Sequence, residues 1–272
     1  MKKLATRIKN YIHTCITFSK AGVTFSSLLL WPIRRRLPHS RNQIDLKTGI
    51  SIILPADSPF LDLFTEIWIR NCYMPSRIEV KQGSTIVDVG ANGGLFTIWA
   101  AINYPHAKIV ALEPSPRIFD FLFRNIFINR LGNVQLLQAA CGGRMGEAIL
   151  YSRGGEELNT LFCQDIFDSS FRPLCRTPLV TIEHVFKRFD VQCCGLLKLD
   201  CEGSEYDILL NTKHETLQRI ERIAMEYHTG FNEHSPGELV TFLESHSFKV
   251  TQSPMRDDGT GYMYAKRSDD RF

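Results

Sequence analysis

Acidic side chains stand at the ends of successive apolar segments, and small residues follow the first of them. Asp88 lies near the end of the apolar run 84–89, and a turn of small residues occupies 90–94. Glu113 ends the next apolar run, 25 residues after Asp88. A glycine turn between a strand and a helix lets backbone N–H groups approach a ligand closely. Two strand-end acids at this spacing predict a pocket for a nucleoside cofactor in a doubly wound sheet.

The order of the small residues favours one cofactor over another. Asp88, Gly90, Asn92 and Gly94 form a D-x-G-x-N-x-G pattern instead of the G-x-G-x-x-G of dinucleotide sites. This pattern fits a turn that binds S-adenosylmethionine (SAM). Asp88 would bind the amino-acid end of SAM, directly or through water, and Glu113 would accept hydrogen bonds from the ribose hydroxyls. The alternative is a tight turn in some other α/β protein.

Two later apolar segments end in residues that can exchange protons. Asp200 follows the run 195–199, and Glu226 and His228 end the run 222–228. Ligands of open α/β sheets bind at the carboxyl ends of the strands. We therefore expect one rim to gather the acids and the histidine at these ends: Asp88, Glu113, Asp200, Glu226 and His228.

The motifs together resemble the FkbM family of SAM-dependent methyltransferases. They are 87–97, 111–116, 125–129, 139–140, 197–205 and 225–228, and the resemblance runs from about 45 to 266. It implies methyl transfer to an oxygen, often a hydroxyl of a sugar or another natural product. The residues that match the family's cofactor site are Asp88, Gly90, Asn92, Gly94 and Glu113, with Ala139 and Ala140 expected at the adenine.

Methylation of an alcohol needs a base or a metal, because a neutral hydroxyl is a weak nucleophile. Asp200 is the first candidate for the acid that faces the methyl group, and capping the following helix is its alternative role. His228 is a candidate base or substrate ligand, and Glu226 could orient it or bind substrate. These three residues and Glu202 also resemble a set of ligands for a divalent cation, although we expect no metal.

Alternating segments position these residues. Strands are expected over 84–89, 108–113, 134–138, 195–200, 222–227, 248–253 and 261–266, and helices over 95–103, 116–129, 182–189, 204–210 and 236–246. The last two strands must be antiparallel, because their link is too short for a parallel crossover. The predicted fold is α/β, a Rossmann-like seven-stranded methyltransferase sheet with helices on both faces and a C-terminal antiparallel hairpin. Residues 146–151 are a candidate extra edge strand, and 152–178 is expected to be a long loop.

Composition indicates one domain with an N-terminal extension. The chain has 272 residues, of which 44% are apolar and 22% charged. Residues 1–44 hold nine Lys and Arg and no acid, so the remainder carries 23 Lys and Arg against 29 Asp and Glu. A mildly acidic domain argues against nucleic acid as the substrate. We divide the chain into the extension 1–44, a hairpin and lid helix over 45–80, and a SAM-binding methyltransferase domain over 81–272.

The basic extension allows three interpretations. It could be a solvated or locally packed segment, a contact with an anionic membrane surface, or a targeting peptide. Eight scattered cysteines without a C-x-x-C pair favour a reducing compartment. We expect a cytoplasmic protein, with membrane association through the extension as an option.

The function predicted from these observations is SAM-dependent O-methylation of a small-molecule or glycan acceptor. Two alternatives remain: a non-catalytic SAM-binding or scaffold protein, and a nicotinamide-dependent oxidoreductase. Asn92 and the C-terminal hairpin disfavour the oxidoreductase. The sequence does not indicate the oligomeric state.

Overall fold

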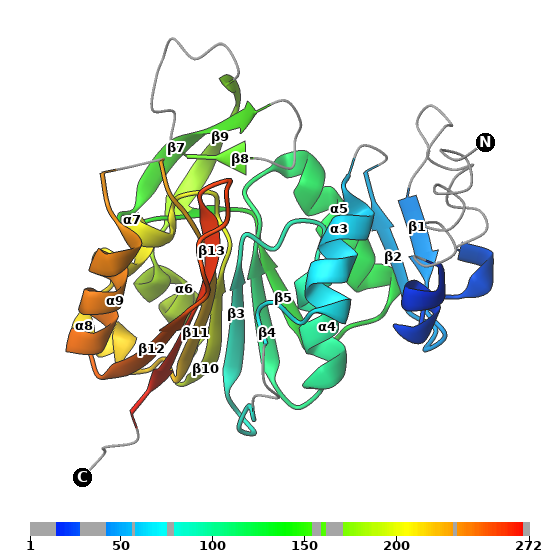
Figure 1. Cartoon of the computed structure of the whole chain (residues 1–272), viewed down its shortest axis with the longest axis horizontal. Coiled ribbons are helices and arrows are strands. Elements are labelled where there is room, and N and C mark those ends of the chain that lie inside the picture. The colour runs from blue at the N-terminus through cyan, green and yellow to red at the C-terminus, as the bar shows by residue number, and fades with distance from the viewer. Residues whose placement is uncertain are drawn as a thin grey trace.

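A seven-stranded sheet forms the centre of the protein (Figure 1). The computed structural model describes residues 15–27, 42–55, 58–74, 79–153, 159–161, 171–230 and 233–268. The strand order is β12-β13-β11-β10-β3-β4-β5, and all neighbours are parallel except β13, which is antiparallel to β11 and β12. The strands are β3 (Thr85–Val89), β4 (Lys108–Leu112), β5 (Val134–Leu137), β10 (Cys194–Leu199), β11 (Arg222–His228), β12 (Phe248–Gln252) and β13 (Thr260–Arg267). The predicted fold is confirmed.

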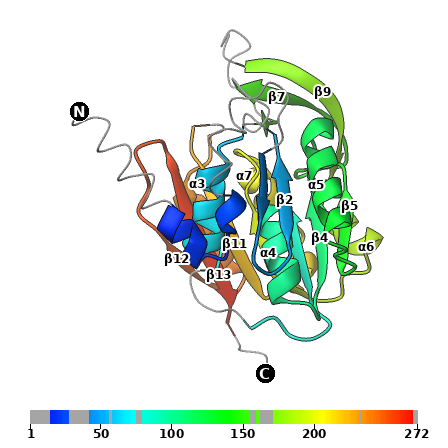
Figure 2. The same cartoon turned by 90° about the vertical axis from the view of Figure 1, so that its right-hand side faces the viewer.

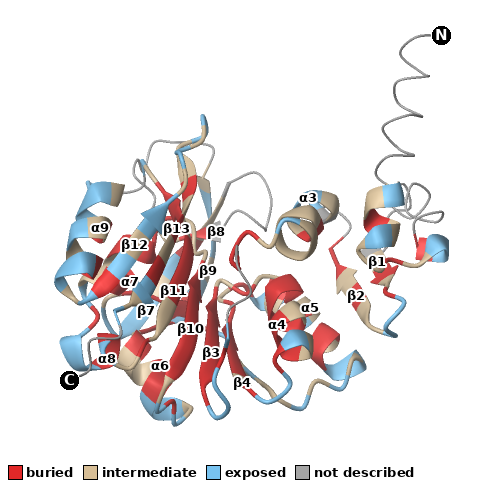
Figure 3. Cartoon of the chain, turned by 60° about the horizontal axis from the view of Figure 1, so that its bottom comes forward, coloured by how far each residue is buried: buried red, intermediate tan, exposed pale blue. Residues whose placement is uncertain are grey.

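Helices cover both faces of this sheet, and they explain the apolar runs of its central strands. Every residue of β3 and β10 is buried, as Figure 3 shows for the middle of the sheet. The covering helices are α4 (Leu95–Asn103), α5 (Pro116–Ile128), α6 (Ile182–Arg188), α7 (Glu205–Leu210), α8 (His214–Leu217) and α9 (Pro236–Ser245). One apolar core packs α6, α7 and α9 against the sheet, and two others pack α4, α5 and the N-terminal elements.

The predicted N-terminal hairpin consists of β1 (Asn42–Asp45) and β2 (Ser51–Leu54). Asn125 of α5 and Asn129, which follows the last residue of that helix, bind the backbone of β2. Asn125 Oδ1 accepts from Ile53 N at 2.8 Å, and Asn129 Oδ1 accepts from Ser51 N at 2.8 Å. Asn125 Nδ2 also donates to Gly93 O at 2.7 Å. The hairpin is thereby fixed to the small-residue turn after β3.

A helix in two parts lies within 45–80, where a lid helix is expected. It begins as α3 (Phe60–Phe64) and continues as a π-helical segment, η1 (Thr65–Ile69). Trp68 Nε1 donates to Leu95 O at 3.1 Å, which places this segment on α4. None of its residues lines the cofactor cavity described below. Its continuation instead carries Tyr73 toward the end of β10.

Part of the N-terminal extension packs on this region. Residues 15–20 are helical, and the Phe18 ring stacks on Phe64 with centroids 5.1 Å apart. Val23 is fully buried and pairs with Leu46 beside the hairpin. Residues 15–27 therefore match the locally packed interpretation. No helix in the described part of the chain is long and apolar enough to cross a membrane.

The prediction of a long loop over 152–178 is wrong at 152–153, 159–160 and 171–178, which are strands, and its residues 154–158 and 162–170 lie outside the described part of the chain. The described strands between 140 and 180 form a second sheet in the order β6-β9-β7-β8, from β6 (Ala140–Cys141), β7 (Gly146–Arg153), β8 (Asn159–Thr160) and β9 (Phe171–Val180). The extra strand predicted at 146–151 is β7, but it belongs to this sheet and not to an edge of the main one. Pro173 and Pro178 are unusual in a strand, because proline has no N–H to donate to the ladder. Pro173 lies at a bulge, where the pairing of β7 with β9 shifts between Leu150 and Tyr151.

Candidate active site

The small-residue turn after β3 lies directly against the end of β10. Gly90 has a φ of +74°, and a Cβ on it would stand 1.8 Å from the backbone oxygen of Asp200. Only glycine permits this approach without moving the backbone. Gly90 therefore brings the two strand ends that carry the predicted cofactor and catalytic residues side by side.

A buried lysine holds the same two strand ends together. Lys198 lies beside Asp88 in the pairing of β10 with β3, and its Nζ is 3.0 Å from Asp88 Oδ1. It also donates to Gly90 O at 2.7 Å and lies 3.8 Å from Asp200 Oδ2. The two aspartates raise the pKa of Lys198 against the effect of burial, so it is charged at neutral pH. The sequence analysis assigned no role to Lys198.

Asp88 and Gly94 lie away from the cavity that the other predicted cofactor residues line. Asp88 is fully buried, and its Oδ2 accepts from Thr97 Oγ1 at 2.6 Å. Gly94 begins α4 in a left-handed conformation, and a Cβ on it would stand 2.7 Å from Leu122 Cδ1. We therefore interpret Asp88 as support for Lys198 and Gly94 as a packing position, whereas the sequence predicts that both belong to the cofactor site, with Asp88 binding the amino-acid end of SAM directly or through water.

Glu113 is buried at the end of β4 and is held by two backbone donors. Its Oε2 accepts from Asn92 N and its Oε1 from Ser115 N, both at 2.9 Å. Burial raises the pKa of Glu113 to about 7, although both N–H groups and Lys198 oppose the shift. The carboxylate lines the cavity, where its remaining lone pairs can accept hydrogen bonds from ribose hydroxyls.

The raised pKa of Glu113 predicts a pH-dependent affinity for the cofactor product S-adenosylhomocysteine (SAH). Protonation removes an acceptor of ribose hydrogen bonds, so the Kd of SAH should fall about tenfold between about pH 6 and pH 8. Calorimetric titration of wild type and Glu113→Gln would measure this. The variant should show less than about a twofold change over the same range. If the Kd of SAH depended on pH equally in wild type and Glu113→Gln, a group other than Glu113 would be responsible for the pH dependence.

An open cavity joins most of the predicted residues at the carboxyl ends of β3, β4, β5 and β10. Its empty volume is about 630 Å³. Six predicted residues line it: Gly90, Asn92, Glu113, Ala139, Ala140 and Asp200. Pro114 and Ile118 add an apolar wall. A carboxylate beside an apolar slot suits the ribose and adenine of SAM, so the residues present fit this cofactor.

Asp200 is positioned by a tyrosine that is distant in sequence. The Tyr73 hydroxyl donates to Asp200 Oδ2 at 2.7 Å and lies 3.4 Å from Glu226 Oε2. Tyr73 is 4% exposed, and its ring packs edge-on against Phe96 and Tyr262. The Asp200 side chain keeps 29% exposure. Asp200 thus has a fixed orientation and access to the cavity.

His228 does not fit the predicted role of a base. Its ring lies between Glu205, whose Oε1 is 3.3 Å from Nδ1, and Glu202, whose Oε2 is 3.6 Å from Nε2. Burial favours the neutral ring, but these carboxylates outweigh it and raise the pKa of His228 to about 10. His228 is therefore an imidazolium at neutral pH, which has no lone pair to accept a proton. It is also absent from the residues that line the cavity.

Glu226 is not among the residues that line the cavity. Its Oε1 accepts from Arg256 Nη1 at 2.8 Å. Burial and the nearby Asp200 raise the pKa of Glu226 to about 7, against His228 and Arg256. This position suits contact with an acceptor molecule more than contact with the cofactor.

Three of the four possible metal ligands come together. Asp200, Glu202 and His228 offer atoms within 4.8 Å of one another. The His228 ring is paired with Glu202 and Glu205 within the protein, and a metal bound here would have to displace a ring proton, because metals bind neutral imidazole. We assign no metal to this cluster.

Comparisons with known proteins agree with the geometry. The model of the methyltransferase FkbM domain matches residues 88–250. The 31-O-demethyl-FK506 methyltransferase FkbM of Streptomyces tacrolimicus is 25% identical over 230 residues, which cover 71% of this chain and 84% of that protein. Methyltransferase sdnD of Sordaria araneosa is 27% identical over 191 residues, covering 60% and 73%.

Solved methyltransferase structures are more distant. The methyltransferase FkbM of Methylobacillus flagellatus KT has a TM-score of 0.46 at 14% identity, over 72% of this chain and 47% of that one. The N-terminal domain of human METTL16, solved with SAH, has a TM-score of 0.49 at 12% identity, over 95% and 94%. Because the family model covers more than half of the sequence, this chain belongs to the FkbM family of methyltransferases, with SAM as its cofactor.

Proposed function

We propose that this protein transfers the methyl group of SAM to a hydroxyl oxygen of a small molecule or glycan. The observation that carries the proposal is the oriented, partly exposed carboxylate of Asp200 at the cofactor cavity. The name of the Streptomyces relative, which acts on an O-demethyl compound, supports oxygen as the acceptor atom. The sugar or glycan class rests on the family resemblance.

The residues divide the work of this reaction between binding and proton transfer. SAM supplies a methyl group that is already activated on a sulfonium. Glu113 would hold the ribose, and the Gly90 turn lies against the β10 end that carries Asp200. Asp200 would take the proton of the acceptor hydroxyl while its oxygen receives the methyl group, and SAH would leave. Tyr73 keeps Asp200 oriented for that transfer.

The direct test is methyl transfer from tritium-labelled SAM to a panel of acceptors. The panel contains neutral glycosides, macrocyclic polyols, amines and carboxylic acids, each matched by an analogue that lacks the candidate acceptor group. The proposal expects labelled methyl ethers of one of the two hydroxyl classes and none from the deoxy analogues. Labelled amines or esters in place of ethers would contradict the proposal of O-methylation.

Tyr73→Phe should lower the kcat of this transfer by about tenfold, because Asp200 loses one hydrogen bond of about 1–1.5 kcal/mol. The KM of the acceptor and the Kd of SAH should change less than about twofold, since Tyr73 lines no part of the cavity. Tyr264→Phe is the matched control, because that hydroxyl donates to the neighbouring Cys72 O and not to Asp200. If Tyr264→Phe lowered kcat as much as Tyr73→Phe, the effect at Tyr73 would be structural and would not come from its hydrogen bond to Asp200.

The two rival functions lead to different results in these assays. A non-catalytic SAM-binding scaffold would bind SAH without labelling any acceptor. A nicotinamide-dependent oxidoreductase would bind NAD at least as well as SAM. Family membership supports the methyltransferase over both.

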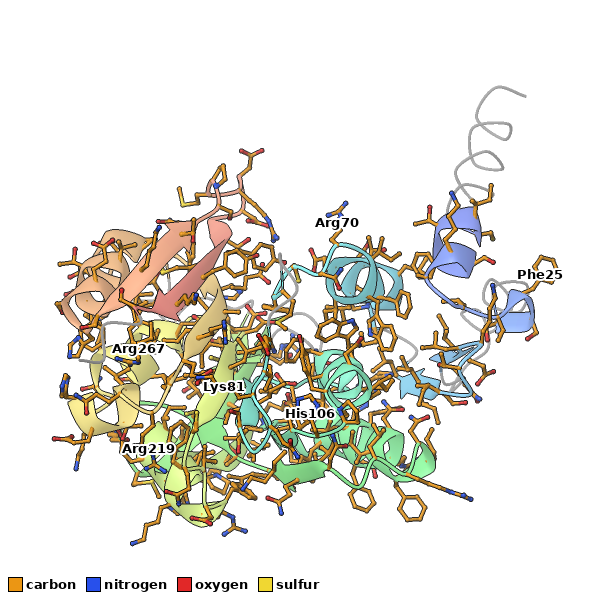
Figure 4. All side chains as sticks on the ribbon, turned by 90° about the horizontal axis from the view of Figure 1, so that it is seen from below. Phe25, Arg70, Lys81, His106, Arg219 and Arg267 are labelled. Carbon is orange, nitrogen blue, oxygen red and sulfur yellow. The ribbon has the colours of Figure 1, made fainter. Side chains whose placement is uncertain are left out.

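We also propose that the N-terminal extension contacts an anionic membrane surface. Phe25 is 73% exposed and Ile16 is 50% exposed. Figure 4 shows Phe25 at the periphery, pointing away from the rest of the protein. The nine Lys and Arg residues of 1–44 add attraction to anionic lipids.

Vesicle sedimentation tests this contact. Phe25→Ser should reduce binding to phosphatidylserine-containing vesicles by about threefold, because an exposed aromatic ring gains by insertion. Met255→Ser, which changes an apolar residue that is 60% exposed between β12 and β13, is the control. If both variants bind as well as wild type, Phe25 takes no part in the contact. If wild type binds neutral vesicles as well as vesicles with phosphatidylserine, the basic residues do not contribute to binding.

A further inference from the structure

The connection between β5 and α6 is long and forms a sheet of its own. It contains the whole second sheet, which lies above the carboxyl ends of the main strands in Figure 1. Figure 2 shows β7 and β9 arching over that edge. The sheet therefore stands at the end of the protein where the cofactor cavity opens.

Two leucines of this connection line the cofactor cavity. Leu150 of β7 is 1% exposed, and Leu161 follows β8 directly. Pro114 and Ile118 line the same cavity. The second sheet thus contributes apolar side chains to the cavity, while the carboxylates of its lining, Glu113, Asp200 and Glu202, follow β4 and β10 of the main sheet.

Hydrogen bonds tie the second sheet to both sides of this cavity. Thr160 Oγ1 donates to the backbone oxygen of Glu202, after β10, at 2.7 Å. Thr177 Oγ1, on β9, donates to Pro114 O, after β4, at 3.5 Å. The short strand β6, which contains Ala140, pairs with the end of β9. The sheet is anchored at β4, β5 and β10, and so it spans the cavity.

We infer that the second sheet is the roof of the cofactor site, with Leu150 and Leu161 covering the adenosine half of SAM and Thr160 fastening β8 to the loop after β10. A purine has two apolar faces, which leucine side chains can cover, whereas the amino-acid end is charged and needs polar partners. The inference rests on SAM as the cofactor. It goes beyond the proposed function, because it requires no statement about the acceptor.

Calorimetric binding of SAH and of free adenosine to the full chain tests the roof. Leu161→Ala should raise the Kd of SAH about tenfold, through loss of apolar contact area, and Thr160→Val about fivefold, through loss of the anchoring hydrogen bond. The Kd of adenosine should rise by the same factors. Ile149→Ala, the neighbour of Leu150 and 40% exposed, is the control and should stay within about twofold.

Three results would overturn the inference. An unchanged Kd of SAH in Leu161→Ala would remove the roof from the binding site. A weaker SAH with unchanged adenosine would place the contact at the amino-acid end. An equal loss in Ile149→Ala would show a general loss of the second sheet. The binding assay contains no acceptor. Its results therefore test the roof even if the proposed O-methylation is not observed.

Discussion

Lys198→Met is expected to lower the free energy of unfolding by about 3–5 kcal/mol, measured by urea denaturation near neutral pH. The Lys198 side chain is 3% exposed, and Asp88, its partner at 3.0 Å, is fully buried. Removal of the ammonium leaves the Asp88 charge without compensation and deprives Gly90 O of its donor. The large cost is therefore that of an unpaired buried charge.

A second variant separates charge from packing. Lys198→Met combined with Asp88→Asn should be more stable than Lys198→Met alone, because neutral Asn removes the uncompensated charge. Lys81→Met is the exposed control: Lys81 pairs with Glu221 at 2.7 Å, but its side chain is 73% exposed, so less than about 1 kcal/mol should be lost. An equal loss in Lys81→Met and Lys198→Met would contradict the role given to Lys198.

Asp200→Asn is expected to lower the kcat of methyl transfer by about 10²–10⁴-fold, the range for loss of a general base. The amide keeps the shape of the side chain but cannot take the acceptor proton. The Kd of SAH should change less than about threefold, since neither the ribose-binding carboxylate nor the apolar wall is altered.

Glu202→Gln is the matched variant for this test. Glu202 also lines the cavity, and its side chain is 24% exposed, but its Oε2 lies 3.6 Å from the charged His228. Its substitution should lower kcat less than about tenfold. A larger effect at Glu202 than at Asp200 would transfer the role of base to Glu202.

The main sheet could be predicted because its signals are local. Buried parallel strands read as apolar runs, and each ended within about two residues of its prediction. The second sheet was missed for an equally local reason. Pro173 and Pro178 disfavour a strand. Pro173 is nevertheless tolerated at a bulge in the pairing of β7 with β9. Pro178 is tolerated because β6, on the other edge of β9, pairs only with Leu179 and Val180.

The site was only partly predictable, because its key contacts join distant segments. A single lysine in the buried strand β10 must be paired, and this signal could have identified Lys198. Nothing in the sequence indicates that Tyr73 reaches Asp200, 127 residues away. His228 was predicted as a base from its strand-end position, whereas its charge depends on Glu202 and Glu205, which another segment supplies.

The central claim is that the cavity beside Glu113 binds SAM, and calorimetric titration of the full chain with SAM and with NAD tests it most directly. The account predicts micromolar binding of SAM, much weaker binding of NAD, and a loss of about 1–3 kcal/mol of SAM binding in Glu113→Ala, because the ribose hydrogen bonds disappear. No binding of SAM, equal binding of NAD, or an unchanged SAM affinity in Glu113→Ala would contradict it.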